Sequence, residues 1–328
     1  MNAALPLDVI DSLIIDRLQG GFPLLPGPFA LAGEPLGLSA AKLCERLQSL
    51  LDRKVLTRFG PMYQVERMGG AFVLAAMVVP EARYDAVAAQ LDALPAVAHN
   101  YRREHELNMW FVLATSTPGR IYDAMLEIEE ATGLRVYDFP KLREYYVGMQ
   151  FAVGGSAPVG RRELVAGDAG AVALDDTDWQ LIRRTQGGLP LLAEPWQQLG
   201  AELGLAADEV CTRLAAMVQN GVIRRIGAVP NHYAIGYAAN GMAVFDVDDE
   251  QVDALGQQVG AQPFVSHCYR RLRRQPVWPY NLFAMCHGRS RDEVQDQVAA
   301  IRQQLGDACR RHEVLFSSRI LKKSGLRV

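Results

Sequence analysis

The sequence predicts an α+β fold, a tandem duplication in which each copy is a winged helix-turn-helix followed by a ferredoxin-like βαββαβ module. Two observations predict this fold. An internal repeat covers nearly all of the 328 residues, since LQGGFPLL at Leu18–Leu25 returns as TQGGLPLL at Thr185–Leu192. Within each copy, helix-like apolar periodicity comes first, and strand-like and helix-like segments alternate after it.

The repeat continues at nearly constant spacing through both copies. Cys44 corresponds to Cys211, and VAHNYRR at Val97–Arg103 corresponds to VSHCYRR at Val265–Arg271. The second copy carries a short insertion, LRRQPVWP, at Leu272–Pro279. A Gly- and Ala-rich stretch without apolar periodicity is predicted to link the copies. The predicted boundaries are 1–66 and 171–232 for the winged helix-turn-helix domains, 67–151 and 233–328 for the ferredoxin-like domains, and 152–170 for the linker.

Each helix-turn-helix begins with an amphipathic helix, ended in the first copy by Gly20-Gly21. A short segment follows at Phe29–Leu36. Ser39 is then suited to cap a helix at Ala40–Leu51, and a small strand follows at Val55–Arg58. The expected apolar stripes of the two longer helices are Val9, Leu13, Ile14 and Leu18, and Leu43, Leu47, Leu50 and Leu51. The second copy repeats these elements at Asp178–Thr185, Pro195–Leu203, Asp208–Gln219 and Val222–Val229.

The rest of each copy has the order βαββαβ. Runs rich in β-branched and aromatic residues indicate strands, and longer segments with helical spacing indicate helices. In the first copy these are Phe72–Val79, Glu81–Leu94, Ala96–Arg103, Met109–Thr115, Gly119–Thr132 and Leu134–Val147, the last with a kink at Pro140. In the second copy they are Gly241–Val247, Glu250–Gly260, Phe264–Arg271, Asn281–Cys286, Arg291–Leu305 and Glu313–Leu321.

Composition excludes several protein classes. Hydrophobic residues make up 49% and charged residues 22%, which is typical of a globular protein and not of a disordered one. No apolar run approaches the roughly 18 residues that a membrane span needs, and the first residues read as a folded helix, so export is not expected. Five cysteines without a C-x-x-C pattern argue against a disulfide framework, so the predicted compartment is the cytoplasm.

The helix-turn-helix modules lack the charge of a DNA-binding surface. Residues 1–66 hold six Lys or Arg against seven acids, and residues 171–229 hold five against seven. The second candidate recognition helix offers Arg213 as its only cation and begins with Asp208 and Glu209, which would face phosphate. With a net charge of −3 overall, the sequence predicts no functional DNA binding.

Unusual cations gather instead in the βαββαβ modules. The pattern His-x-Tyr-Arg-Arg occurs twice, as the first tetrad, His99, Tyr101, Arg102 and Arg103, and as the second tetrad, His267, Tyr269, Arg270 and Arg271. Because side chains alternate along a strand, Arg102 and Arg270 are expected on the face opposite the other members. Paired guanidinium groups suit carboxylate or phosphate recognition, and a neighbouring histidine suits proton donation or metal ligation.

Longer strings in both copies carry a family resemblance. They are HNYRREHELNMWF at His99–Phe111, GVIRRIGAVPNHYAIGY at Gly221–Tyr237 and HCYRRLRRQPVWPYNLFAMCHG at His267–Gly288. Over nearly all of both copies the chain resembles the siroheme decarboxylases of the Lrp/AsnC-like family, in the form in which two related subunits are fused. The resemblance implies conversion of siroheme to 12,18-didecarboxysiroheme in heme d1 synthesis or the alternative heme route, and the fused form favours the former.

The resemblance also implies site residues. The macrocycle needs an apolar slot with cations at its rim, and an acid must protonate the carbanion left when carbon dioxide departs. His99 and His267 are the candidate catalytic acids. No cofactor is implied, because the iron is part of the substrate, and no metal site is predicted. The candidate substrate-binding residues are Tyr101, Arg102, Arg103, His105, Trp110, Arg224, Arg225, His232, Tyr269, Arg270, Arg271, Trp278, Tyr280, Asn281 and His287.

Alternatives stay open at this level. A transcription regulator of the Lrp/AsnC type and a heme-binding sensor without catalysis are the alternative functions. Because His232 belongs to the second copy alone and His105 to the first alone, either one or two working sites fit the sequence. Regulators of this fold pair through their β modules, so the copies are expected to form an intramolecular pseudo-dimer, with a further homodimer open. The expected partner is siroheme as the substrate, and no association with a membrane is expected.

Overall fold

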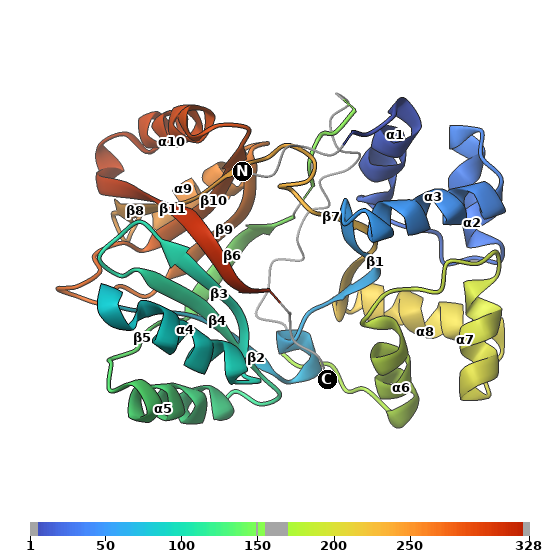
Figure 1. The fold of residues 1–328 in the computed structure, drawn as a ribbon, viewed down its shortest axis with the longest axis horizontal. Helices are drawn as coiled ribbons and strands as arrows, with labels where there is room; N and C mark the ends of the chain where they lie inside the picture. Colours follow the sequence, from blue (N-terminus) through green and yellow to red (C-terminus); the bar gives the residue numbers. More distant parts are fainter. Residues whose placement is uncertain (1–5, 149, 155–169, 324–328) are drawn as a thin grey trace.

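The computed structural model describes residues 6–148, 150–154 and 170–323. A helical lobe and a β lobe lie side by side (Figure 1). The helical lobe comprises α1 (Val9–Leu18), α2 (Pro28–Gly33), the 3₁₀ turn η1 (Glu34–Leu36), α3 (Ala40–Asp52), β1 (Leu56–Tyr63), α6 (Asp176–Thr185), α7 (Pro195–Leu203), α8 (Ala207–Gln219) and β7 (Ile223–Pro230). The α+β duplication predicted from the sequence is confirmed.

The β lobe contains the remaining elements of both copies. From the first copy come η2 (Glu66–Met68), β2 (Ala71–Met77), η3 (Glu81–Arg83), α4 (Tyr84–Ala93), β3 (Val97–Arg103), β4 (Met109–Thr115), α5 (Arg120–Thr132), β5 (Tyr137–Phe139) and β6 (Lys141–Val147). From the second come β8 (Ala239–Val247), α9 (Val252–Gly260), β9 (Val265–Arg271), β10 (Leu282–Gly288), α10 (Arg291–Leu305), η4 (Gly306–Ala308) and β11 (Cys309–Lys323).

The wings of the two copies pair with each other. β1 and β7 form a two-stranded antiparallel sheet with Gly60 opposite Gly227. A Cβ at Gly227 would lie 2.1 Å from the carbonyl oxygen of Leu18, and its φ of +157° strains any other residue. Glycine therefore permits the close approach that joins the two helix-turn-helix units into one lobe.

The first helices show one confirmed expectation and one error. Ser39 caps α3, since its side chain accepts a hydrogen bond from the amide of Lys42. The expected stripe of α1 is wrong in part, because Val9 and Leu13 are 74% and 37% exposed while Ile15 is buried. α1 contacts β7 of the second copy as well as η1. Because of these contacts, the buried face of α1 differs from the face that local periodicity indicates.

The β lobe is one sheet of nine strands in the order β5-β2-β4-β3-β11-β8-β10-β9-β6. Strands cross between the copies twice: β6 pairs with β9, and β11 pairs first with β8 and then with β3. The predicted strand Leu134–Val147 breaks at Pro140 into β5 and β6, which lets β6 join the strands of the other copy. The two βαββαβ modules therefore share one sheet instead of forming two.

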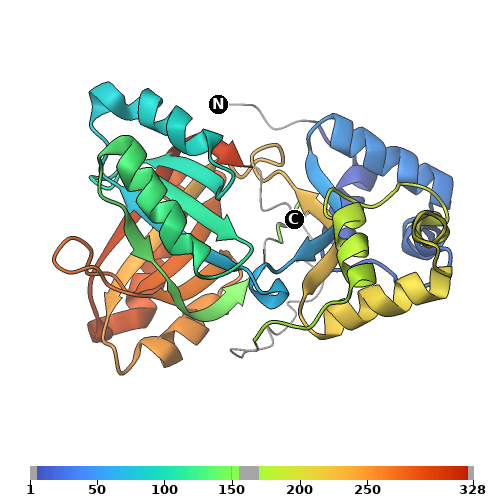
Figure 2. The same cartoon turned by 90° about the horizontal axis from the view of Figure 1, so that it is seen from below.

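The sheet folds over so that its two arms face each other. Helices α4 and α5 cover the outside of one arm, and α9 and α10 cover the outside of the other (Figure 2). We call the opposite side of each arm, which faces the other arm, the inner face. A core shared by both copies fills one end between the inner faces and consists of Ala76, Leu107, Trp110, Phe139, Met242, Val244, Trp278, Tyr280, Phe283 and Leu315.

The predicted linker 152–170 falls for the most part, at 155–169, outside the described residues. The segment before it is packed onto α1. Phe151 is buried, and its backbone exchanges two hydrogen bonds of 2.8 Å with the side chain of Gln19. Among the described residues, no helix combines the length and apolar character that crossing a membrane requires.

Candidate functional site

The first tetrad on β3 shows the expected alternation. The rings of His99 and Tyr101 lie 6.2 Å apart, and the guanidinium of Arg103 lies 5.7 Å from the Tyr101 ring, so these three share the inner face. Arg102 points outward, where its Nη2 lies 2.7 Å from Oε2 of Glu81.

The second tetrad on β9 repeats this arrangement. The rings of His267 and Tyr269 lie 6.1 Å apart on the inner face, and the guanidinium of Arg271 lies 4.7 Å from the Tyr269 ring. Nη1 of Arg271 donates a 2.6 Å hydrogen bond to the carbonyl of Phe139. Each copy therefore presents an imidazole, a phenol and a guanidinium on one inner face.

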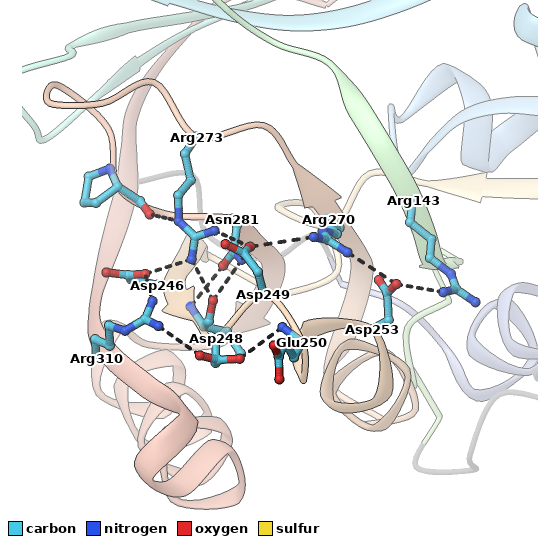
Figure 3. Close-up of polar contacts among 12 residues, drawn as sticks. Arg143, Asp246, Asp248, Asp249, Glu250, Asp253, Arg270, Arg273, Asn281 and Arg310 are labelled. Atoms are coloured by element: carbon cyan, nitrogen blue, oxygen red, sulfur yellow. Dashed lines mark hydrogen bonds and ion pairs between the residues drawn. The ribbon is translucent and has the colours of Figure 1, made fainter.

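The outward arginine of the second tetrad belongs to an ion-pair network (Figure 3). Arg270 lies 3.3 Å from a carboxylate oxygen of Asp253 and 3.6 Å from one of Asp249. Arg143, which comes from β6 of the first copy, contacts Asp253 at 3.0 Å. The network therefore stabilises the pairing of β6 with β9, on the face of the sheet opposite His267 and Tyr269.

The inner faces of the two copies differ in exposure. β8 is buried along its whole length, whereas Ala71–Leu74 at the start of the corresponding strand β2 are half-buried. Phe72 and Leu74 alternate with the core residue Ala76, so they lie on the inner face. Arg103 is 6% exposed, and Arg271 keeps intermediate exposure. Solvent therefore reaches the inner face more readily at two places, which are Arg271 on β9 of the second copy and the start of β2 in the first copy.

Three histidines from separate segments meet on the inner face of the second copy. Ser266 Oγ lies 2.9 Å from Nδ1 of His267 and 2.9 Å from Nε2 of His287. The His287 ring lies 5.0 Å from that of His232, and Phe151 packs edge-on against it at 5.2 Å. We call Ser266, His232, His267 and His287 the histidine cluster; all are buried except His267, which keeps intermediate exposure.

The surroundings of the second tetrad keep the imidazole of His267 uncharged. Burial, together with the charges of Arg224 and Arg271, lowers the pKa of His267 to about 4, so the imidazole is neutral at neutral pH. Burial also raises the pKa of the Tyr269 hydroxyl.

A half-buried ion pair joins the helical lobe to β6 beside the second tetrad. Arg224 on β7 donates two hydrogen bonds, of 2.7 and 3.1 Å, to the carboxylate of Glu144. Lys141 contacts Glu144 at 2.9 Å and Glu66 at 2.8 Å. Burial opposes ionisation of Glu144, but the hydrogen bonds and charges of Arg224 and Lys141 outweigh it and lower its pKa to about 2.

The first tetrad is more enclosed. Arg103 Nη1 donates a 2.7 Å hydrogen bond to the carbonyl of Leu315, and burial lowers the pKa of its guanidinium to about 10. The charge of Arg103 also acts on Tyr233, whose ring lies 4.1 Å from that of His232. The turn that carries His232 therefore connects the histidine cluster with the first tetrad.

Four predicted substrate-binding residues lie at the core end between the arms. The Trp278 ring lies 5.0 Å from those of Trp110 and Tyr280 and 5.4 Å from that of His105. His105 also contacts the Glu313 carboxylate at 3.1 Å. Trp110, Trp278 and Tyr280 are at most 4% exposed, so they fill the core and do not line an accessible wall.

Asn281 makes a backbone contact that recurs in both copies. Its side chain exchanges two hydrogen bonds of 2.9 Å with the amide and carbonyl of Val247. Asn108 of the first copy does the same with Val79, at 2.9 and 2.8 Å. The repetition indicates a structural role at the end of β8.

Arg225 makes a second repeated backbone contact. It donates to the carbonyl of Gln19, directly after α1, and Arg58 donates at 2.7 Å to the carbonyl of Gln186, directly after α6. A cation at the carboxyl end of a helix satisfies its unpaired carbonyl groups and its dipole. Each arginine therefore caps a helix of the other copy.

Sequence reasoning missed Ser266, Glu144 and Phe151. The signal for Ser266 was present, since it precedes His267 and stands where the first copy has Ala98. Glu144 and Phe151 carried no signal, because their partners lie far away in the chain. Within the described ranges, no group of three or more His, Cys, Asp or Glu could hold a metal ion.

Models of two protein families match both copies. The AsnC-like ligand binding domain matches residues 67–146 and 234–322, and the siroheme decarboxylase NirDL-like HTH domain matches residues 11–56 and 178–224. The first pair of ranges falls on the β lobe and the second pair on the helical lobe.

Some similar proteins match the whole chain, and others match about half of it. The chain is 32% identical over 323 residues to the siroheme decarboxylase NirDL subunit of Paracoccus denitrificans (strain Pd 1222), with 97% of each chain covered. It is 57% identical over 156 residues to the siroheme decarboxylase NirH subunit of Paracoccus pantotrophus, covering 48% of this chain and 97% of the relative.

Solved structures of siroheme decarboxylase NirDL share the fold. One crystal structure gives a TM-score of 0.73 at 26% identity, covering 98% of this chain and 94% of that chain. A second, in complex with an iron-uroporphyrin III analogue, gives a TM-score of 0.71 at the same identity and coverage.

Proposed function

Because this chain belongs to the siroheme decarboxylase family, in the fused form of the NirDL subunit, we propose that it is a carboxy-lyase that converts siroheme to 12,18-didecarboxysiroheme. The family predicted from the sequence is confirmed. In the proposed reaction the acetate side chains at C12 and C18 become methyl groups. The fused arrangement supports a place in heme d1 synthesis.

One observation carries this proposal: imidazole, phenol and guanidinium groups gather on the inner face of the second copy beside Met285, a half-buried apolar residue that pairs with His267. Siroheme is a flat, apolar macrocycle edged by carboxylates. A site for it needs cations at the rim and an apolar wall. The complex of the similar NirDL structure with an iron-uroporphyrin III analogue supports a tetrapyrrole ligand.

The proposed chemistry uses the residues of the second tetrad. Arg271 holds a substrate carboxylate by charge-assisted hydrogen bonds, while Arg224 keeps its two hydrogen bonds to Glu144. Loss of carbon dioxide leaves an electron pair on the methylene carbon, which the conjugated macrocycle delocalises. His267 then delivers a proton to that carbon, with His99 as the alternative donor. The step is non-oxidative and the iron is part of the substrate, so we propose no cofactor held by the protein.

Anaerobic incubation of the purified protein with siroheme, followed by mass spectrometry, tests the proposal. The expected products have lost one and then two carbon dioxide units, and His267→Ala is expected to slow both losses by about 100-fold. Siroheme of unchanged mass would overturn the proposed function. Wild-type turnover in His99→Ala, in His267→Ala and in the double variant would remove the imidazoles from the mechanism.

We propose no functional DNA binding and a cytoplasmic location. Arg46 on α3 lies 2.9 Å from a carboxylate oxygen of Asp11, and Arg213 on α8 lies 2.9 Å from one of Asp178. These ion pairs neutralise the arginines of both candidate recognition helices, which supports a scaffolding role for the helical lobe. A mobility shift with genomic fragments checks this, and specific retardation would favour a regulator. The cysteine usage supports the cytoplasm.

A further inference from the structure

We propose that Ser266 is a positioning residue that relays a proton from His287 to His267, and that this relay makes the second copy the working half of the enzyme. The inference rests on the proposed decarboxylation and names the proton path within it.

A β-bulge places the Ser266 hydroxyl next to the ring of His267. On β10, Met285 pairs with His267 and the next residue, Cys286, pairs with Val265, so Ser266 is the extra residue of β9. Consecutive strand residues normally face opposite sides, and a bulge re-aims one of them. Ser266 Oγ therefore reaches both Nδ1 of His267 and Nε2 of His287, at 2.9 Å each.

The first copy has the same bulge without the relay. Val97 pairs with Leu113 and His99 pairs with Val112, so Ala98 is the extra residue of β3. In the same register, Ala114 occupies the position of His287. The first tetrad therefore keeps its imidazole, phenol and guanidinium, but alanines stand where the second copy has Ser266 and His287.

A hydroxyl between two imidazoles couples their protonation. Serine donates one hydrogen bond and accepts others, so a proton given by His287 Nε2 to Ser266 requires Ser266 to donate to His267 Nδ1. The remote nitrogen of His267, Nε2, then carries the proton that goes to the substrate. Burial keeps His267 neutral. Since a neutral imidazole is a poor acid alone, it needs a proton at Nδ1 as it releases one from Nε2.

The step balances as follows. The bond between the methylene carbon and its carboxylate breaks, carbon dioxide leaves, and the electron pair on the carbon takes the Nε2 proton of His267. Nδ1 of His267 takes the hydroxyl proton of Ser266, and the Ser266 oxygen takes the Nε2 proton of His287. His287 takes a proton from solvent at Nδ1 as it gives up its Nε2 proton, so each ring is neutral before and after the step and only its tautomer changes.

Three variants test the relay. Ser266→Ala gives the second copy the residue of the first, Ser266→Thr keeps a hydroxyl, and Ala98→Ser adds a hydroxyl where no second imidazole stands. We expect Ser266→Ala to lower kcat for siroheme at least about 10-fold with KM within about twofold, because a relay acts on proton transfer and not on binding. Ser266→Thr is expected to keep most of the activity, and Ala98→Ser all of it.

Two readouts separate a relay from a packing role. The dependence of kcat on the deuterium fraction of the solvent is expected to be curved in the wild type, where several protons move together, and linear in Ser266→Ala. In the ligand-free protein, ¹⁵N spectra of the histidine rings are expected to show altered tautomers of His267 and His287 in Ser266→Ala alone. His267→Gln and His287→Gln assign these signals.

The outcomes distinguish the relay from the proposed function. Wild-type kcat with an unchanged deuterium dependence in Ser266→Ala overturns the relay and leaves the decarboxylase proposal standing. Failure of the wild type to change siroheme overturns the decarboxylase proposal. The ring spectra then decide the relay by themselves: tautomers unaffected by Ser266→Ala overturn it, and altered tautomers support it.

Discussion

The imidazole of His267 is held neutral by its surroundings, which has a consequence for stability. Its pKa in the folded protein is about 4, lowered by burial and by the charges of Arg224 and Arg271, against which Glu144 acts in the opposite direction. In an unfolded chain a histidine has a pKa of about 6.5. Because the unfolded state binds the proton more tightly, this contribution to stability is complete above pH 6.5 and falls as the pH drops towards 4.

The free energy of unfolding of the wild type is expected to decrease between about pH 7 and pH 4, and about 3 kcal/mol of this decrease comes from His267. In His267→Gln the decrease is therefore expected to be smaller by about 3 kcal/mol. Urea denaturation of both proteins across that range measures the difference. Curves that stay parallel over the whole range would contradict the prediction.

Glu144 gives a second prediction, with the same direction of pH dependence but at lower pH. Its folded pKa of about 2 lies below the ordinary 4.5, so its contribution is present above pH 4.5 and is lost as the pH falls towards 2. Glu144→Gln leaves Arg224 without its carboxylate and is expected to cost about 3 kcal/mol at neutral pH, measured by urea denaturation.

A matched control and a double variant sharpen this prediction. Glu45→Gln breaks the exposed pair with Lys42 and is expected to cost no more than about 0.5 kcal/mol. Glu144→Gln combined with Arg224→Gln is expected to cost less than the sum of the single variants, because the two groups interact directly. If the decreases in the free energy of unfolding caused by the single variants add up to that of the double variant, the interaction between Glu144 and Arg224 does not contribute to stability.

At the residue scale, sequence reasoning predicted what depends on one strand alone. The alternation of each tetrad, with Arg102 and Arg270 outward, follows from strand geometry and is observed. The positions of Trp110 and Trp278 could not be predicted in the same way. Both rings become core because strands of different copies face each other, and nothing local indicates that packing.

At the scale of elements, the duplication offers a matched pair of helix caps. Ser39 caps α3, whereas the corresponding residue before α8 is Ala206, which makes no side-chain cap and has a similar extended backbone. Ser39→Ala is expected to lower the free energy of unfolding by about 1 kcal/mol, and Ala206→Ser to raise it by about 0.5–1 kcal/mol.

Ala206→Ser gains further from its sequence context. Glu209 stands three residues later, so a serine at 206 would complete a capping box with it. Thermal unfolding of both variants beside the wild type checks the prediction. A decrease in the melting temperature of Ala206→Ser would contradict it.

Most helices and strands could be predicted because their signals are local. α7, β4 and α10 have the predicted bounds, and apolar periodicity accounts for them. The bulges at Ala98 and Ser266 could not be predicted, since a bulge exists only relative to the strand that pairs with it. β11 is likewise longer than predicted because it serves two partners.

At the scale of the whole molecule, three strand pairs join the two copies: β1 with β7, β3 with β11, and β6 with β9. Each copy alone would leave the edges of these strands unpaired. The copies are therefore expected to fold as one unit.

Cleavage between the copies tests this expectation. A protease site introduced within residues 155–169 should, after cutting, leave two fragments that elute together in size-exclusion chromatography and keep siroheme binding. Their midpoint of unfolding should then rise with protein concentration, because the fragments stabilise each other by mass action. Fragments that separate under native conditions would show that the cross-copy pairs are not what holds the lobes together.

The sequence by itself determined the duplication, the order of elements in each copy, the family and the two tetrads, because a repeat, a periodicity and a motif are properties of neighbouring residues. Only the tertiary structure decided which cations remain near solvent, that Ser266 bridges two histidines, and that Trp110, Trp278 and Tyr280 are core. These properties arise where strands of different copies meet. Side-chain contacts there depend on the register of the paired strands and on which faces of the sheet pack together, and neither can be inferred from the local sequence.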